Sequence, residues 1–178
     1  MLRTKCAFWG VLAALGLVST RAGGDATHDV ASAFYVSKSE NRNQVHYAVR
    51  LDDQCAPAGA APVQPYWRML EHDAHATEPL LSREVPAYGI AEQSIVSRGE
   101  RGGVVRVVLR ALRSRPLLLT TFASGQSCAA SASLVIGGTP ATLTNIHVQL
   151  KWPWGVAYLL VSGRALSDGH AVSERIEP

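Results

Sequence analysis

The sequence predicts an all-β, single-domain protein, an antiparallel meander that is barrel-like, with a two-sheet β-sandwich as the alternative arrangement. Apolar and polar residues alternate along most of the chain. Gly, Pro, Asn and Asp clusters interrupt the alternation about every 10 to 15 residues, a spacing typical of antiparallel sandwiches and barrels. At most one short helix is expected.

The clearest predicted element is a hairpin near the start of the domain. Residues 45–51 alternate as a half-buried strand requires, and residues 33–37 form a similar run. The buried face of the second run would hold Val45, Tyr47, Val49 and Leu51. Between the runs, the segment 39–43 contains Asn residues, which tolerate a left-handed backbone and favour a tight turn.

Eight further runs have the length and pattern of strands. They are residues 63–70, 90–96, 104–112, 117–123, 130–136, 143–151, 156–162 and 172–176. Turn residues separate several of these runs, for example Gly137 and Gly138. The stretch 52–62 is rich in Ala, Pro and Gly and predicts a long loop. The helix is expected over residues 78–85, ended by Pro86.

The first 22 residues predict a signal peptide. Arg3 and Lys5 precede the apolar run 6–19, and the segment 20–22 supplies small residues where a peptidase cuts. The run is too short to cross a bilayer, which needs about 20 residues. We expect export to the periplasm or the extracellular space, a flexible segment 23–32, a β-rich domain over residues 33–178, and no membrane insertion after the leader is removed.

Removal of the leader changes the charge balance. Three of the 17 basic residues lie in it, so 14 remain to balance the 14 acidic ones. A neutral mature chain gives no electrostatic reason to expect a nucleic-acid partner. Six arginines lie close together in sequence, and we expect them to be solvated strand and turn charges: Arg98, Arg101, Arg106, Arg110, Arg113 and Arg115.

Only Cys55 and Cys128 remain after the leader. An even pair in an oxidising compartment predicts a disulfide. A competing hypothesis makes Cys128 a nucleophile with His147 as its base. The segment 125–129 approaches the nucleophile-elbow pattern, but its second glycine is replaced by Ala129 and the residues that follow predict a strand.

A metal centre and a cofactor are not expected. The densest set of possible ligands is the segment 71–78, with His72, Asp73 and His75 between two glutamates. A predicted loop does not hold three or four donors in a converging geometry. Phosphate-binding and dinucleotide-binding glycine motifs are absent from the sequence.

Aromatic residues provide the candidate ligand-binding site. The candidates are Tyr66, Trp67, Tyr88, Trp152 and Trp154. Tyr and Trp combine an apolar ring with a polar edge, which suits both a core and a binding cleft. The structural hypothesis places these rings in the core, and the functional one places them around a cavity for an apolar or glycan-like ligand.

Four blocks in order carry a resemblance: residues 34–47, 62–67, 87–89 and 152–158. Together they resemble an uncharacterised bacterial family, domain of unknown function 4833, over about residues 33–176. The resemblance implies a small exported protein built mainly of strands, and it brings no catalytic residues.

These observations favour an exported, non-enzymatic binding or interaction module. Its partner would be a small molecule, a glycan or an envelope protein. One alternative is an extracytoplasmic enzyme that acts on cell-envelope material through Cys128 and His147 or the segment 72–78. A structural envelope protein is the other.

Overall fold

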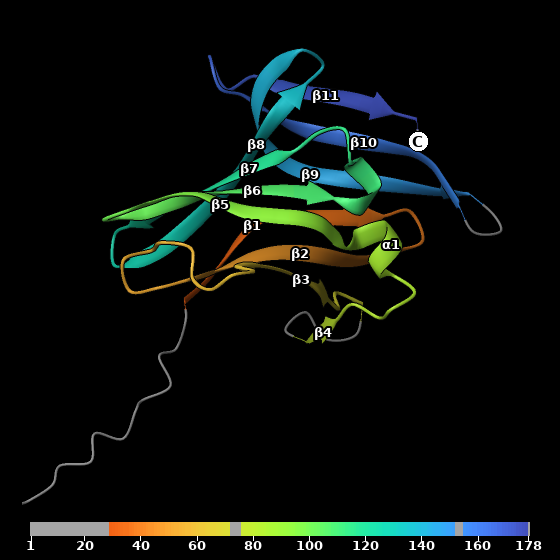
Figure 1. Ribbon diagram of the computed structural model, residues 1–178. Coiled ribbons are helices and arrows are strands. Elements are labelled where there is room, and N and C mark those ends of the chain that lie inside the picture. Colours follow the sequence, from red (N-terminus) through yellow and green to blue (C-terminus); the bar gives the residue numbers. More distant parts are fainter. Residues whose placement is uncertain (1–28, 72–75, 152–154, 178) are drawn as a thin grey trace, which may run out of the picture.

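The computed structural model describes residues 29–71, 76–151 and 155–177. Within them, eleven strands form one large mixed sheet, mostly antiparallel, with one short helix (Figure 1). The strands are β1 (Asp29–Lys38), β2 (Asn41–Leu51), β3 (Val63–Arg68), β4 (Thr77–Pro79), β5 (Ile90–Gly99), β6 (Gly102–Leu109), β7 (Leu117–Ser124), β8 (Ser127–Ile136), β9 (Thr139–Lys151), β10 (Gly155–Ala165) and β11 (Ala171–Ile176). The helix is α1 (Val85–Tyr88), and Arg110–Leu112 forms a 3-10 turn, η1.

Strand β9 joins two parts of this sheet. Along one edge it pairs with β10. Along the other edge, residues 139–142 pair antiparallel with β8, and residues 145–148 pair parallel with β1. The order β4-β3-β2-β1-β9-β8-β7-β6-β5 therefore runs from one half of the sheet to the other through β9.

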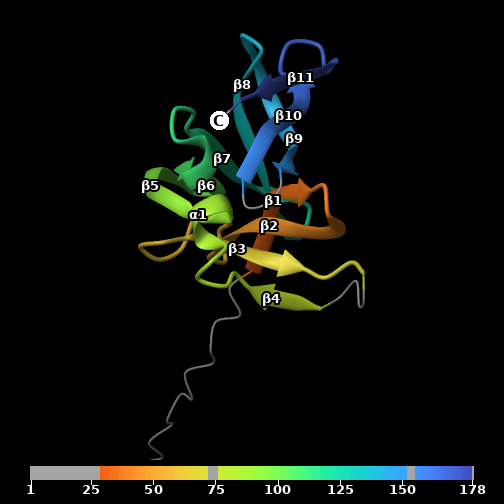
Figure 2. The same cartoon turned by 90° about the vertical axis from the view of Figure 1, so that its right-hand side faces the viewer.

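The two halves enclose a single hydrophobic core. From β2 it receives the predicted inner face of residues 45–51, in which Val45, Tyr47, Val49 and Leu51 are at most 1% exposed. From β6 and β7 it receives Val105, Val107, Leu117 and Leu119, which are fully buried. Figure 2 shows β5 and β6 beside the β1–β3 half, with α1 next to them. The alternation predicted for residues 45–51 is thus confirmed.

The predicted closure into a barrel is wrong. A barrel requires a continuous backbone ladder around its circumference. In the described residues the ladder ends at β4 on one side and at β5 on the other. The simple meander is also interrupted, because β1 pairs with β9 and is parallel to it. The strands still form one sheet, so the alternative of two separate sheets is wrong as well.

The first hairpin is confirmed, but its turn differs from the prediction. The turn is Ser39–Glu40, and β2 already begins at Asn41. The asparagines do not adopt a left-handed backbone, since Cys55 is the one non-glycine residue with positive φ in the described part of the chain. Instead, Asn41 Oδ1 accepts a hydrogen bond from the Asn43 N–H, at 3.2 Å.

The helix predicted over residues 78–85 is wrong. Glu78 belongs to β4, and the helix occupies Val85–Tyr88. Pro86 lies in the first turn of the helix, where backbone N–H groups have no acceptor within the helix, so the missing N–H of proline removes no hydrogen bond. The proline therefore helps to start the helix that it was expected to end.

The predicted disulfide is confirmed, because Cys55 and Cys128 are joined. Cys55 lies in the 52–62 segment, which is a long loop as predicted, and Cys128 lies on β8. Residues 29–32, expected in a flexible segment, belong to β1. The predicted signal peptide lies outside the described residues. Among the helices of the described segments, none has the length and apolar character that a membrane crossing requires.

Candidate functional site

Trp67 and Tyr88 lie in the core. Both residues are 6% exposed, and their rings meet edge to face with centroids 5.3 Å apart. Trp67 Nε1 donates a hydrogen bond to Glu84 Oε2 at 2.8 Å, and the Tyr47 hydroxyl donates to the Tyr88 carbonyl at 2.6 Å. Burial, with the nearby carboxylates of Glu40 and Glu84, raises the pKa of Tyr88 to about 12.

A cavity of about 240 Å³ borders the buried Trp67 ring. We call it the Trp67 cavity. Its lining combines charged, amide and apolar side chains, which come from β1, β2, β3, the residue after β3, β4 and the segment before α1: Lys38, Asn41, Asn43, Trp67, Met69, Glu78, Pro79, Leu81, Arg83 and Glu84. The Lys38 ammonium lies 5.2 Å from the Trp67 ring centroid. Trp67 is therefore both a core residue and part of a cavity wall.

Tyr66 points the other way. Successive strand residues alternate between faces, so Tyr66 and Trp67 lie on opposite faces of β3. The register aligns Tyr66 with His46 on β2 and His46 with Tyr35 on β1. Their rings stack in a row, with centroids 5.8 Å apart for Tyr66 and His46 and 5.7 Å for His46 and Tyr35. Trp152 and Trp154 lie outside the described residues, so the five predicted aromatics are not seen to converge.

His46 is held at both ring nitrogens. Ser32 Oγ lies 3.0 Å from Nδ1, and Gln44 Oε1 lies 3.1 Å from Nε2. Gln44 Oε1 can only accept, so Nε2 carries the proton of the neutral ring and Nδ1 accepts from the Ser32 hydroxyl. Burial lowers the pKa of His46, and the charge of Arg68 lowers it further.

A second row lies two residues further along the same strands and contains His147, the base proposed for Cys128. His147 Nδ1 lies 3.1 Å from Ser37 Oγ, across the β1–β9 pair. The hypothesis of a Cys128 nucleophile is wrong, because Cys128 is bonded to Cys55 and has no free thiol. Gly125 and its neighbours form the turn between β7 and β8, so this segment has no nucleophile elbow either.

These two rows form one surface, which we call the ladder face. It consists of Asn145 and His147 on β9, Tyr35 and Ser37 on β1, Gln44 and His46 on β2, and Tyr66 and Arg68 on β3. The strands lie side by side in Figure 2. The surface offers hydroxyl, amide, imidazole, phenol and guanidinium groups and no carboxylate. The sequence signal for it was the polar and aromatic set on the outward positions of the first hairpin.

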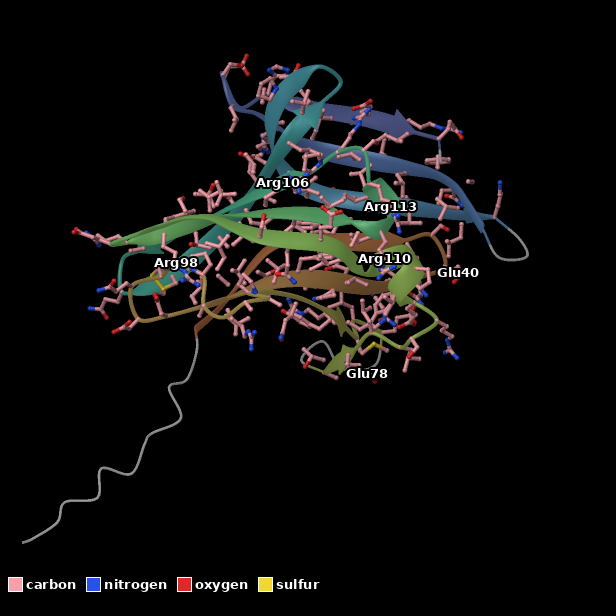
Figure 3. All side chains as sticks on the ribbon, viewed as in Figure 1. Glu40, Glu78, Arg98, Arg106, Arg110 and Arg113 are labelled. Atoms are coloured by element: carbon pink, nitrogen blue, oxygen red, sulfur yellow. A yellow bond between two sulfur atoms is a disulfide. The ribbon has the colours of Figure 1, made fainter. Side chains whose placement is uncertain are left out.

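The six arginines do not gather into one patch. Figure 3 shows Arg98 at the opposite end of β5 and β6 from Arg110 and Arg113. Arg106 lies 3.6 Å from Glu92, and Arg115 forms a bidentate pair with Glu174. The expectation of solvated strand and turn charges is confirmed for four of the six arginines, which are exposed, whereas Arg106 and Arg115 are half-buried.

No cluster of three or more His, Cys, Asp or Glu side chains suited to a metal ion occurs in the described ranges. His72, Asp73 and His75 of the sequence-based candidate lie outside them.

Comparison with known proteins identifies the family. The family model of domain of unknown function 4833 (DUF4833) matches residues 34–175. No curated protein matches the chain, and no solved structure matches it.

Proposed function

We propose that this chain, which belongs to the DUF4833 family, is an exported, non-enzymatic glycan-binding module that uses the ladder face. The family brings no assigned activity, so the proposal is argued from the side chains of this protein. The proposal depends on the row of Tyr35, His46 and Tyr66, which crosses three strands beside the hydroxyl of Ser37 and the amide of Gln44. Such groups match a polyhydroxylated ligand, and aromatic rings supply apolar contact with sugar C–H groups. The Cys55–Cys128 disulfide supports an oxidising compartment.

The absence of carboxylates favours a glycan over a basic peptide. A cationic partner would find no opposite charge among the ladder-face residues. Amides, hydroxyls and imidazoles donate and accept at once, as sugar hydroxyls do. The rings stack along the row, and the register places Asn145 beside Tyr35 and Pro79 beside Tyr66, so sugars would contact the solvent-facing ring edges.

Binding is favoured over catalysis by the surroundings of His147. In the described part of the chain its hydrogen-bond partner is Ser37, and no carboxylate orients the imidazole. A serine nucleophile needs a base that is itself held in position. The enzyme and structural alternatives stay open as outcomes of the test.

The test is a binding titration with two defined probes, N-acetylchitohexaose and soluble peptidoglycan glycan strands, followed by NMR amide shifts. We expect shifts confined to β9, β1, β2 and β3. Tyr35→Ala and Tyr66→Ala should each weaken binding about five- to tenfold, since a good ring contact contributes about 1–1.5 kcal/mol. Phe122→Ala, an exposed aromatic on the outward face of β7, is the matched control and should leave affinity unchanged.

Two results would overturn the proposal. One is the absence of any shift with both probes at millimolar concentration. The other is hydrolysis of either probe that disappears in Ser37→Ala, which would establish the enzyme alternative.

A further inference from the structure

We propose a second site, separate from the ladder face: the Trp67 cavity binds a quaternary ammonium group, and the Lys38 ammonium occupies this position in the free protein. Lys38 Nζ lies 5.2 Å from the Trp67 ring centroid, within the range of a cation–π contact. Trp is the aromatic side chain that binds cations best. The protein itself thus shows that a cation is accepted at this ring.

Three carboxylates contact the cavity or its cation. Glu40 Oε2 lies 3.6 Å from Lys38 Nζ, and Glu84 Oε2 accepts the Trp67 indole N–H. Glu78 lies opposite Trp67 in the β3–β4 register and lines the cavity. Figure 3 shows Glu40 at the β1–β2 turn and Glu78 near β4. The cavity lining contains the carboxylates of Glu78 and Glu84 and the cations of Lys38 and Arg83, so the lining has a net negative charge when Lys38 leaves.

Lys38 can leave at modest cost. It is the last residue of β1, next to the two-residue turn, and its ammonium is carried on a flexible stem. Its partner Glu40 is 62% exposed, so this ion pair is screened by solvent and contributes little. Lys38 can then follow Glu40 into solvent while keeping that contact.

The remaining walls select a methylated cation. Met69, Pro79 and Leu81 give the cavity apolar surface, which a primary ammonium cannot use. A trimethylammonium group has methyl groups to bury there and a weaker hydration shell to lose, as aromatic sites for choline and methyl-lysine illustrate. About 240 Å³ is below the size of drug-sized pockets, yet sufficient for such a headgroup.

The experiment follows the Trp67 indole N–H resonance, assigned by its loss in Trp67→Phe, during titration of the folded protein with choline chloride. Sodium chloride at equal ionic strength and 3,3-dimethyl-1-butanol, a neutral isostere of choline, are the controls. We expect choline alone to shift this resonance. Lys38→Met, which keeps the stem and removes the competing ammonium, should bind choline about two- to fivefold more tightly.

Glu84→Gln tests the charge without removing the hydrogen bond to the indole, and it should weaken choline binding. Sedimentation with phosphatidylcholine vesicles distinguishes the source: co-sedimentation indicates a lipid headgroup, and its absence with positive choline binding indicates a soluble or polymer-linked one. Equal shifts by choline and its isostere, or no shift in both the wild type and Lys38→Met, would overturn the proposal.

Discussion

The side-chain amide of Gln93 pairs with both backbone groups of Val63, as a neighbouring strand would. Gln93 Oε1 accepts from the Val63 N–H at 2.9 Å, and Gln93 Nε2 donates to the Val63 carbonyl at 3.2 Å. Val63 lies on β3, outside the part of this strand that pairs with β4, and Gln93 lies on β5, the strand that ends the other side of the sheet. One side chain thus satisfies, across the open seam, backbone groups that a neighbouring strand would otherwise pair.

Gln93→Ala should therefore destabilise the fold. Val63 is 2% exposed, so its N–H and carbonyl would lose their partner without gaining full access to water. Leaving such groups unpaired costs about 1–3 kcal/mol, measurable as a lower free energy of unfolding in urea. Gln64→Ala, at an exposed position of the same strand, should change it by less than about 0.5 kcal/mol. Equal losses in the two variants would mean that the seam contact has no special role.

The disulfide between Cys55 and Cys128 should provide a large part of the stability. It spans 73 residues, and in the chain-entropy model such a loop restricts the unfolded chain by up to about 4 kcal/mol. We expect Cys55→Ala/Cys128→Ala to lower the free energy of unfolding by about 2–4 kcal/mol. Reducing agent should shift the denaturation midpoint of the wild type but not that of the double variant. A thiol assay on the oxidised protein should find neither of these two cysteines free.

A hydrogen bond to the backbone of Cys55 also holds this loop and does not involve the sulfur atoms. The Thr121 hydroxyl donates to the Cys55 carbonyl at 2.8 Å. Thr121→Val should therefore destabilise the double cysteine variant as well as the wild type, by about 1 kcal/mol in each. A loss in the wild type alone would show that this hydrogen bond forms only when the disulfide holds the loop.

Local sequence patterns predicted the strands well, because alternation is a property of neighbouring residues. The inner face of residues 45–51 is an example. The parallel pairing of Tyr35 with Asn145 was not predictable in this way, since it joins residues 110 positions apart and depends on how the sheet folds over its core. The helix was misplaced because proline begins helices as readily as it ends them.

The candidate site was only partly predictable, for a reason already present in the sequence. Tyr66 and Trp67 are neighbours on a strand, so they cannot share a face. Grouping them as one aromatic site ignored this rule, and the structure assigns them to the ladder face and to the core. The stacking of His46 on Tyr35 depends on a register that the sequence does not state.

The ion pair between Arg115 and Glu174 should make stability depend on acid pH. Hydrogen bonds from Arg115, and one from the Gly137 N–H, lower the pKa of Glu174 to about 2. Because the pKa in the folded state lies below that in the unfolded state, this contribution is complete above about pH 4.5 and is lost as the pH falls through about 2. Since both side chains are partly exposed, we expect about 0.5–1 kcal/mol.

Urea denaturation of Glu174→Gln from pH 6 to pH 2 checks this. The variant should be less stable than the wild type at pH 6, and the difference should shrink as the pH approaches 2. Glu177→Gln is the control, because Glu177 is 64% exposed although it contacts Arg175. A constant difference across the range would show that Glu174 acts through packing and not through its charge.

His46 should produce a separate loss of stability just below neutral pH. Burial between Tyr35 and Tyr66 lowers its pKa, and Arg68 adds to the effect. For this base, the unfolded chain takes up a proton near its ordinary pKa of 6.5, before the folded protein does. The stabilisation is thus complete above about pH 6.5 and decreases as the pH falls toward the folded-state pKa.

His46→Gln keeps an amide in the row and cannot titrate. It should lower the free energy of unfolding by about 1 kcal/mol at pH 7.5 and abolish this decrease. Free energies of unfolding at pH 7.5, 6.0 and 5.0 measure the effect, with His170→Gln at an exposed position as the control. If His46→Gln retains the same decrease as the wild type while His170→Gln loses it, the titrating group is not in the ladder face.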